Sequence, residues 1–114
     1  ILVLALSTSE IGVDIEKERK KISIVKQKFL SKFENNFLNR TDQDKMLTRI
    51  WTSKEAVYKI INMSGISFKK NIIINPFKLQ DSFGNATVKT ENFNLKFKLK
   101  FITFREYYLT LAYK

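Results

Sequence analysis

The feature that most constrains the fold is a strict two-residue alternation near the end of the chain. Between positions 95 and 101, Leu or Phe occupies every second position and Lys occupies each position between them. Successive side chains of a β-strand point to opposite faces, so Leu95–Phe101 is predicted to be a strand with one buried and one exposed face. The apolar phase changes near Ile102, which predicts a β-bulge there.

The N-terminal segment predicts two more strands. Ile1–Leu6 is a nearly continuous apolar run, as expected of a strand that is covered on both faces. Ser7–Ser9 forms a polar turn. In Ile11–Glu16 apolar residues alternate with Gly, Asp and Glu. We therefore expect a β-hairpin at the start of the chain.

Helical spacing dominates the middle of the chain. Ile22–Lys32 has apolar residues at helical intervals, and Phe33–Leu38 is an ambiguous connector. A longer helix is expected from about Thr41 to Asn62, with a capping box of Thr41 and Asp44 and a stop at Gly65. Further strands are predicted around the turn at 81–85 and at the C-terminus, over Ile72–Leu79, Ala86–Thr90 and 107–113.

Together these elements predict one α+β domain over residues 1–114, an antiparallel sheet with a long helix packed on it. No apolar run is long enough to span a bilayer, and the opening segment lacks the features of a signal peptide. We expect a cytoplasmic protein without a membrane partner. Because the chain begins within a predicted strand, we also expect a further N-terminal portion.

Two absences limit the chemistry. The chain contains no Cys and no His, which excludes the usual zinc sites and every nucleophile or acid–base pair that needs those residues. Carboxylates, lysines, arginines and tyrosines remain, and they suit Mg²⁺ and phosphate chemistry. The net charge of +10 indicates an anionic partner: nucleic acid, a membrane surface, a phosphorylated cofactor or an acidic protein.

Two local patterns supply candidate site residues. Asp14 and Glu16 lie two apart in a predicted strand, so their carboxylates share one face about 6–7 Å apart and could reach one cation. On the long helix, Trp51, Glu55 and Lys59 share another face. Taken singly, each pattern also fits ordinary surface charges. Taken together, three carboxylates could hold one Mg²⁺, with Lys59 facing its phosphate ligands.

These residues carry a resemblance to a known family. Gly12–Glu16 (GVDIE), followed by Trp51–Lys59 (WTSKEAVYK), resembles the two signature motifs of the 4′-phosphopantetheinyl transferase superfamily. Their separation is typical of the surfactin-synthetase-activating type. Segments 29–34, 65–67 and 108–113 resemble the family sequence around those motifs.

The resemblance implies a function and a set of roles. The enzymes transfer 4′-phosphopantetheine from coenzyme A to a serine of an acyl or peptidyl carrier protein, with Mg²⁺ as cofactor. By position, Asp14, Glu16 and Glu55 would bind the metal. Lys59 and Lys54 would contact the coenzyme A phosphates, and Lys59 would assist the departing adenosine 3′,5′-bisphosphate. Glu55 is the candidate for removing the serine proton, with Glu16 as the second choice.

The same resemblance is incomplete in one respect. Surfactin-type enzymes have two similar halves with coenzyme A between them, and this chain resembles the second half only. The family's Ser-His motif before the hairpin is also absent. The smaller holo-acyl-carrier-protein synthases have one unit per chain and form trimers, so self-association could complete the cleft.

Two alternative functions are also compatible with the sequence, one from the residues and one from the resemblance. The Lys/Phe alternation of 94–101 would suit a basic nucleic-acid-binding module, although that leaves both acidic motifs unexplained. A catalytically inactive remnant that binds coenzyme A is the other alternative. The exposed lysines of the alternating strand could dock an acidic carrier protein, or they could form a solvated strand face: Lys96, Lys98 and Lys100.

Overall fold

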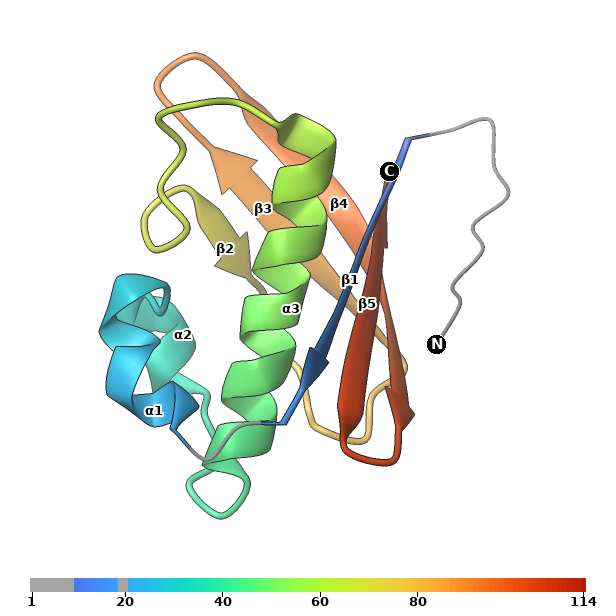
Figure 1. Cartoon of the computed structure of the whole chain (residues 1–114). Coiled ribbons are helices and arrows are strands. Elements are labelled where there is room, and N and C mark those ends of the chain that lie inside the picture. The colour runs from blue at the N-terminus through green and yellow to red at the C-terminus, as the bar shows by residue number, and fades with distance from the viewer. Residues whose placement is uncertain (1–9, 19–20) are drawn as a thin grey trace.

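The computed structural model describes residues 10–18 and 21–114 (Figure 1). The predictions for Ile1–Leu6 and for its hairpin lie outside the described residues. The elements are β1 (Ile11–Lys17), α1 (Ile22–Val25), the 3₁₀ turn η1 (Lys26–Lys28), α2 (Lys32–Asn36), α3 (Gln43–Ile61), β2 (Ile72–Ile74), β3 (Phe83–Lys89), β4 (Asn94–Phe104) and β5 (Tyr107–Tyr113).

The strands form one antiparallel sheet in the order β1-β5-β4-β3-β2, and the long helix α3 lies against one of its faces (Figure 1). The short helices α1 and α2 lie beside α3, near its N-terminal half. The predicted α+β class, with a long helix packed on an antiparallel sheet, is therefore confirmed. The order also makes β1, which carries the acidic triplet, an edge strand of the described sheet.

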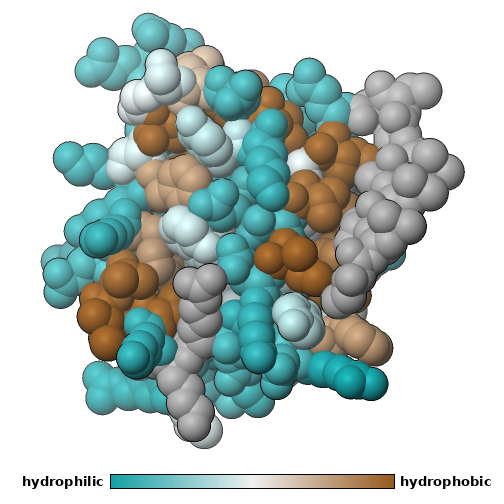
Figure 2. Space-filling model, viewed as in Figure 1, coloured by the Kyte–Doolittle hydropathy of each residue, from teal (hydrophilic) through white to brown (hydrophobic). Residues whose placement is uncertain are grey.

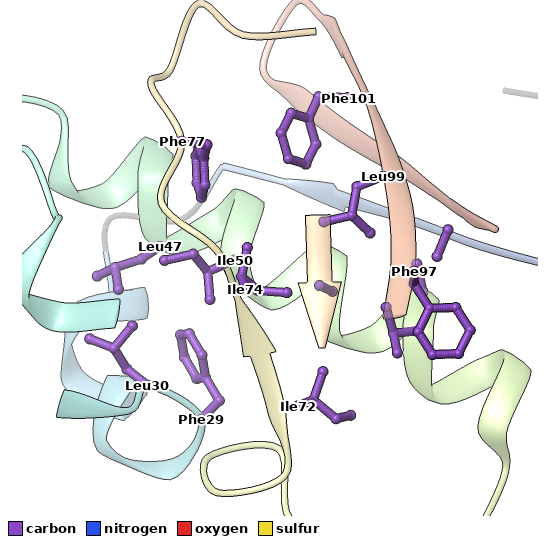
Figure 3. Close-up of a cluster of buried hydrophobic side chains, with 14 of the residues drawn as sticks. Phe29, Leu30, Leu47, Ile50, Ile72, Ile74, Phe77, Phe97, Leu99 and Phe101 are labelled. Carbon is purple, nitrogen blue, oxygen red and sulfur yellow. The ribbon is translucent and has the colours of Figure 1, made fainter. Parts of the chain in front are cut away.

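The core lies between α3 and the inner face of the sheet (Figure 3). As the alternation predicts, Phe97 and Leu99 of β4 are buried, whereas the alternating lysines of the strand are exposed: Lys96, Lys98 and Lys100. Leu47 and Ile50 of α3 pack into the same cluster and are completely buried. Each fully buried side chain of this size contributes about 1.5–3 kcal/mol, so this packing fixes where the helix lies on the sheet.

The predicted bulge near Ile102 is wrong. The pairing of β4 with β5 keeps one register from Lys98 to Phe104, so no residue is inserted. Ile102 instead points to the outer face, opposite Leu109, and the two line a shallow apolar hollow with Ile15. Apolar residues on both sides of the strand produced the apparent change of phase.

The strands at the edge of the sheet opposite β1 also differ from the prediction. Only Ile72–Ile74 of the expected strand Ile72–Leu79 pairs with β3, and the chain leaves the sheet before Pro76. Proline has no N–H to donate to a neighbouring strand. The partner strand begins at Phe83 rather than at Ala86, so part of the predicted turn is strand.

The helix ends were predicted less accurately than the helices themselves. The capping box of Thr41 and Asp44 is wrong, because α3 begins after Asp42 without a side-chain cap. A complete capping box instead opens α2, where Ser31 and Glu34 bond each other's main-chain N–H. At its far end α3 stops at Asn62, whose φ of 44° is left-handed, before Gly65 is reached.

The surface around α1 carries exposed apolar side chains. In the space-filling view, brown atoms gather over the α1 and α2 region, at the lower left (Figure 2). Ile24, Val25 and Phe33 are the large apolar residues exposed on these short helices. Within the residues that the structure describes, no helix is both long and apolar enough to cross a membrane.

Candidate active site

The candidate site is the contact between β1 and α3. A Cβ atom placed on Gly12 would lie 1.8 Å from the main-chain oxygen of Ala56, so only glycine allows the strand to approach the helix this closely. Side chains two apart on a strand share a face. The face of β1 that carries Asp14 and Glu16 is therefore turned toward α3.

Asp14 forms an ion pair with Lys59 of α3. The Lys59 Nζ lies 3.0 Å from Asp14 Oδ1 and donates a second hydrogen bond, of 2.8 Å, to the main-chain oxygen of Val13. The Asp14 side chain is 11% exposed and that of Lys59 is 50% exposed. The lysine therefore joins the strand to the helix and remains accessible to an anion from solvent.

The pKa of Asp14 is raised above its ordinary value, chiefly because burial penalises the charged carboxylate. The Lys59 hydrogen bond and charge oppose this change in pKa, whereas the charge and hydrogen bonding of Glu16 add to it. In the described part of the chain, no donor bonds to the buried Asp14 Oδ2. An unpaired oxygen of this kind is costly unless a proton or a cation reaches it.

Glu16 accepts a hydrogen bond from Trp51, which lies two turns before Lys59 on α3. The indole Nε1 of Trp51 donates to Glu16 Oε1 over 3.2 Å. Trp51 and Lys59 thus reach the strand from the same side of α3, two turns apart. The predicted face of the helix therefore does face the predicted pair of acids.

Glu55 lies between Trp51 and Lys59 on this face of the helix. Its pKa is raised, first by burial and then by the negative charge of Asp14; the charge of Lys59 opposes this and that of Glu16 adds to it. The strand acids therefore act electrostatically on the helix acid. The structure brings together four of the predicted site residues: Asp14, Glu16, Glu55 and Lys59.

The carboxylates suit Mg²⁺ in chemistry, but they do not form a preassembled three-ligand cluster. Oxygen donors are what Mg²⁺ prefers, and the unpaired Asp14 Oδ2 and the raised pKa of Glu55 are both relieved by an added cation. Among residues 10–18 and 21–114, however, no three acidic side chains are close enough together to hold a metal. Lys59 is the cation that Asp14 contacts in this structure.

A cavity of about 470 Å³ opens beside the site. Glu16 and Trp51 form one side of it, and α1, η1 and Phe29 form the other. Most of its wall is apolar, and among residues 10–18 and 21–114 the charged residues that line it besides Glu16 are three lysines: Lys17, Lys21 and Lys28. The cavity therefore gives an apolar or anionic group a route to Glu16.

The strand acids, the helix acid and the lysine of the site all lie within a segment that matches a known family. The family model of the 4′-phosphopantetheinyl transferase superfamily matches residues 10–112, which is most of the chain. The chain belongs to this superfamily. No curated protein was found to match the chain.

In this phosphopantetheinyl transferase unit, Lys54 does not lie where the sequence predicted. Its side chain is fully buried beside α2 rather than among the strand acids, and its ammonium donates to Glu34 Oε1 and to the main-chain oxygens of Phe29 and Phe68. These three bonds use all the protons of a lysine ammonium. Lys54 therefore has no proton free for a coenzyme A phosphate in this structure.

Sequence reasoning gave no role to two other residues, one in the core of this transferase and one at its site. Glu34 is fully buried and accepts from Lys54, from Ser31 N and from Ile74 N. Its Ser-x-x-Glu spacing from Ser31 is a readable capping signal. The indole N–H of Trp51 gave no comparable signal, because its acceptor Glu16 is distant in sequence and was set beside it only by folding.

Proposed function

We propose that this transferase moves 4′-phosphopantetheine from coenzyme A to a serine hydroxyl of an acyl or peptidyl carrier protein in the cytoplasm, and that the reaction depends on Mg²⁺. Membership of the superfamily supports the transfer itself. The observation that carries the proposal to these residues is the convergence of Asp14 and Glu16 of β1 on the Glu55–Lys59 face of α3.

Asp14, Glu16 and Glu55 are the residues that would hold Mg²⁺. Support comes from the unpaired Oδ2 of Asp14 and from the like-charge effect of both strand acids on Glu55. When bound, such an ion neutralises phosphate charge and polarises the bond between phosphorus and the leaving oxygen. The half-exposed ammonium of Lys59 lies next to Asp14 and would stabilise the same phosphates as charge moves onto the leaving group.

In the proposed reaction, the serine oxygen forms a bond to the pantetheine-bearing phosphorus of coenzyme A. The bond from that phosphorus to the bridging oxygen breaks, and adenosine 3′,5′-bisphosphate leaves with the electron pair. The serine proton passes to Glu55. Glu55 is assigned this step because the chain has no histidine that could act as the base.

We further propose that the chain is the second half of an enzyme of the surfactin-synthetase-activating type. Support comes from the residues of the motifs GVDIE and WTSKEAVYK and from the separation of the two motifs in the sequence. A second unit, either an N-terminal half or another copy of the chain, would then complete the coenzyme A cleft on the β1–α3 side.

Mass spectrometry of an apo carrier protein tests the function. The carrier is incubated with coenzyme A, Mg²⁺ and the transferase, supplied both as this chain and with any N-terminal half that its gene encodes. We expect the carrier to gain the mass of one phosphopantetheine group. Glu55→Gln should abolish the gain, whereas Glu91→Gln, at an exposed turn, should preserve it.

Two results would contradict the proposal. An unmodified carrier with the longest form of the protein would remove the transferase assignment for this chain, and coenzyme A binding without transfer would support the inactive remnant instead. Full activity in Glu55→Gln would leave the superfamily membership intact but would exclude the proposed role of Glu55.

A further inference from the structure

Trp51 is joined to Glu16 by the 3.2 Å hydrogen bond from its indole N–H, and its ring packs against two other aromatic rings. Its ring centroid lies 5.3 Å from that of Phe29, edge to face, and 5.5 Å from that of Phe68. A flat ring in contact with two others has little freedom to rotate. The direction of the N–H is therefore set by the two phenylalanines.

The two phenylalanines are fixed in turn by one buried cation. Lys54, one turn after Trp51 on α3, donates to the main-chain oxygens of both Phe29 and Phe68, each over 2.6 Å. Its third bond, of 2.8 Å, goes to Glu34 Oε1. The other oxygen of Glu34 accepts from Ile74 N of β2 over 2.7 Å.

This arrangement links the core to one acid of the site. Glu34 neutralises Lys54, Lys54 fixes the chain at Phe29 and Phe68, these rings hold Trp51, and Trp51 holds Glu16. A carboxylate with one oxygen bonded to a fixed donor loses rotational freedom about its last bonds. Partners of this kind, behind the ligands of metal sites, commonly change metal affinity by 10- to 100-fold when they are removed.

We propose that Trp51 is a positioning residue for Glu16, and that the buried Glu34–Lys54 pair supports it. The inference rests on the proposed function, because Glu16 must bind the metal for its orientation to matter. It gives Lys54, which the family resemblance assigned to phosphate binding, a structural role that reaches Glu16 only through the two phenylalanines and Trp51.

The chain offers a direct test, because Trp51 is its single tryptophan. Biosynthetic replacement of tryptophan by β-(3-benzothienyl)alanine exchanges the N–H of this one residue for sulfur and preserves the two-ring shape. Mn²⁺ replaces Mg²⁺ as the probe, and its dissociation constant is measured by electron paramagnetic resonance of the free ion. We expect Mn²⁺ binding to weaken about tenfold while the midpoint of thermal unfolding stays nearly constant.

Two variants complete the test. Trp51→Phe also lacks the N–H, and it should weaken Mn²⁺ binding similarly. It replaces the analogue in the test if the analogue protein folds poorly. Tyr58→Phe is the matched control: Tyr58 packs against Phe68, with ring centroids 5.3 Å apart, and its substitution should leave Mn²⁺ affinity unchanged.

The outcomes separate the two levels of the argument. If the unmodified protein does not bind Mn²⁺, the proposed metal site fails and the positioning role fails with it. If the unmodified protein binds Mn²⁺ and both Trp51 variants bind it equally well, the positioning role alone is overturned. Weakened binding in the Tyr58→Phe control would also overturn it, because general loosening of the aromatic cluster would then explain the effect.

Discussion

At the scale of single residues, the site depends on a glycine as much as on its charged groups. Gly12 lets β1 lie directly against α3, and without that approach Asp14 could not reach Lys59. Asp14 of β1 and Glu55 of α3 are consequently brought into partly buried surroundings, where burial raises the pKa of both carboxyl groups. Close packing and the raised pKa values thus have one structural cause.

Gly12→Ala should separate the strand from the helix. The added methyl group would meet main-chain atoms of Ala56, which cannot rotate away, so we expect a loss of about 2 kcal/mol or more in the free energy of unfolding. Urea denaturation measures it. Gly65→Ala is the comparison: its Cβ meets open space, and its φ of 84° should cost about 1 kcal/mol. Equal losses in the two variants would contradict the close-approach argument.

Glu55→Gln should stabilise the metal-free fold at neutral pH. Because the folded-state pKa is raised, the charged form opposes folding above that pKa, and below the ordinary value of 4.5 both states are protonated and the effect vanishes. We expect a gain of no more than about 1 kcal/mol at pH 7, since Glu55 is partly exposed and solvent screens its charge. Unfolding measured from pH 3 to 8 checks this. A gain that persists at pH 3, or that Glu91→Gln shares, would contradict it.

At the scale of elements, α3 organises the molecule through two neighbouring faces. One face presents Trp51, Glu55 and Lys59 to β1, and the adjacent face places Lys54 between α2, β2 and the loop at Phe68. Arg49 adds a third connection, since its guanidinium lies 4.7 Å from the Phe101 ring and donates to Leu79 O. The helix is therefore fixed by buried charges as well as by its apolar stripe.

Lys54→Met should be among the most destabilising single substitutions in the chain. It leaves Glu34 buried without its cation, and the loss of one partner from a buried pair costs about 3–5 kcal/mol. Urea denaturation measures the loss, and Lys54→Met combined with Glu34→Gln should recover part of it. A loss below about 1 kcal/mol would mean that Lys54 is not needed in the core and would reopen its assignment to phosphate binding.

At the scale of the whole molecule, the sheet separates its charges. In the five strands of the described chain, Asp14 and Glu16 are the only acidic residues, and both face α3. The exposed lysines of β4 occupy the outer face, where no strand carboxylate opposes them. With a net charge of +10, the protein as a whole attracts an anionic partner.

Transfer to an acidic carrier protein should therefore depend on salt. Raising the ionic strength shortens the range of the positive field, so kcat/KM for the carrier should fall several-fold between low and high salt, with less change in kcat. The triple variant Lys96→Gln, Lys98→Gln, Lys100→Gln should change kcat less than twofold, because these lysines lie on the sheet face away from Asp14. Equal kcat/KM at all salt concentrations would contradict the steering argument, and loss of kcat in the triple variant would place the lysines at the site.

The sequence by itself determined the class of fold and proposed the residues of the candidate site. Periodicity marked the sheet and α3, and the two motifs proposed Asp14, Glu16, Glu55 and Lys59 together with Lys54, because strand and helix spacing decide which side chains share a face. Only the tertiary structure decided what each charged side chain of the helix motif contacts. Adjacent residues of a helix point in different directions, so Glu55 faces β1 while Lys54 enters the core. No local sequence pattern predicts that Lys54 pairs there with the buried Glu34. The same holds for Trp51 and Ile102, whose partners Glu16 and Leu109 come from strands that only folding brings alongside.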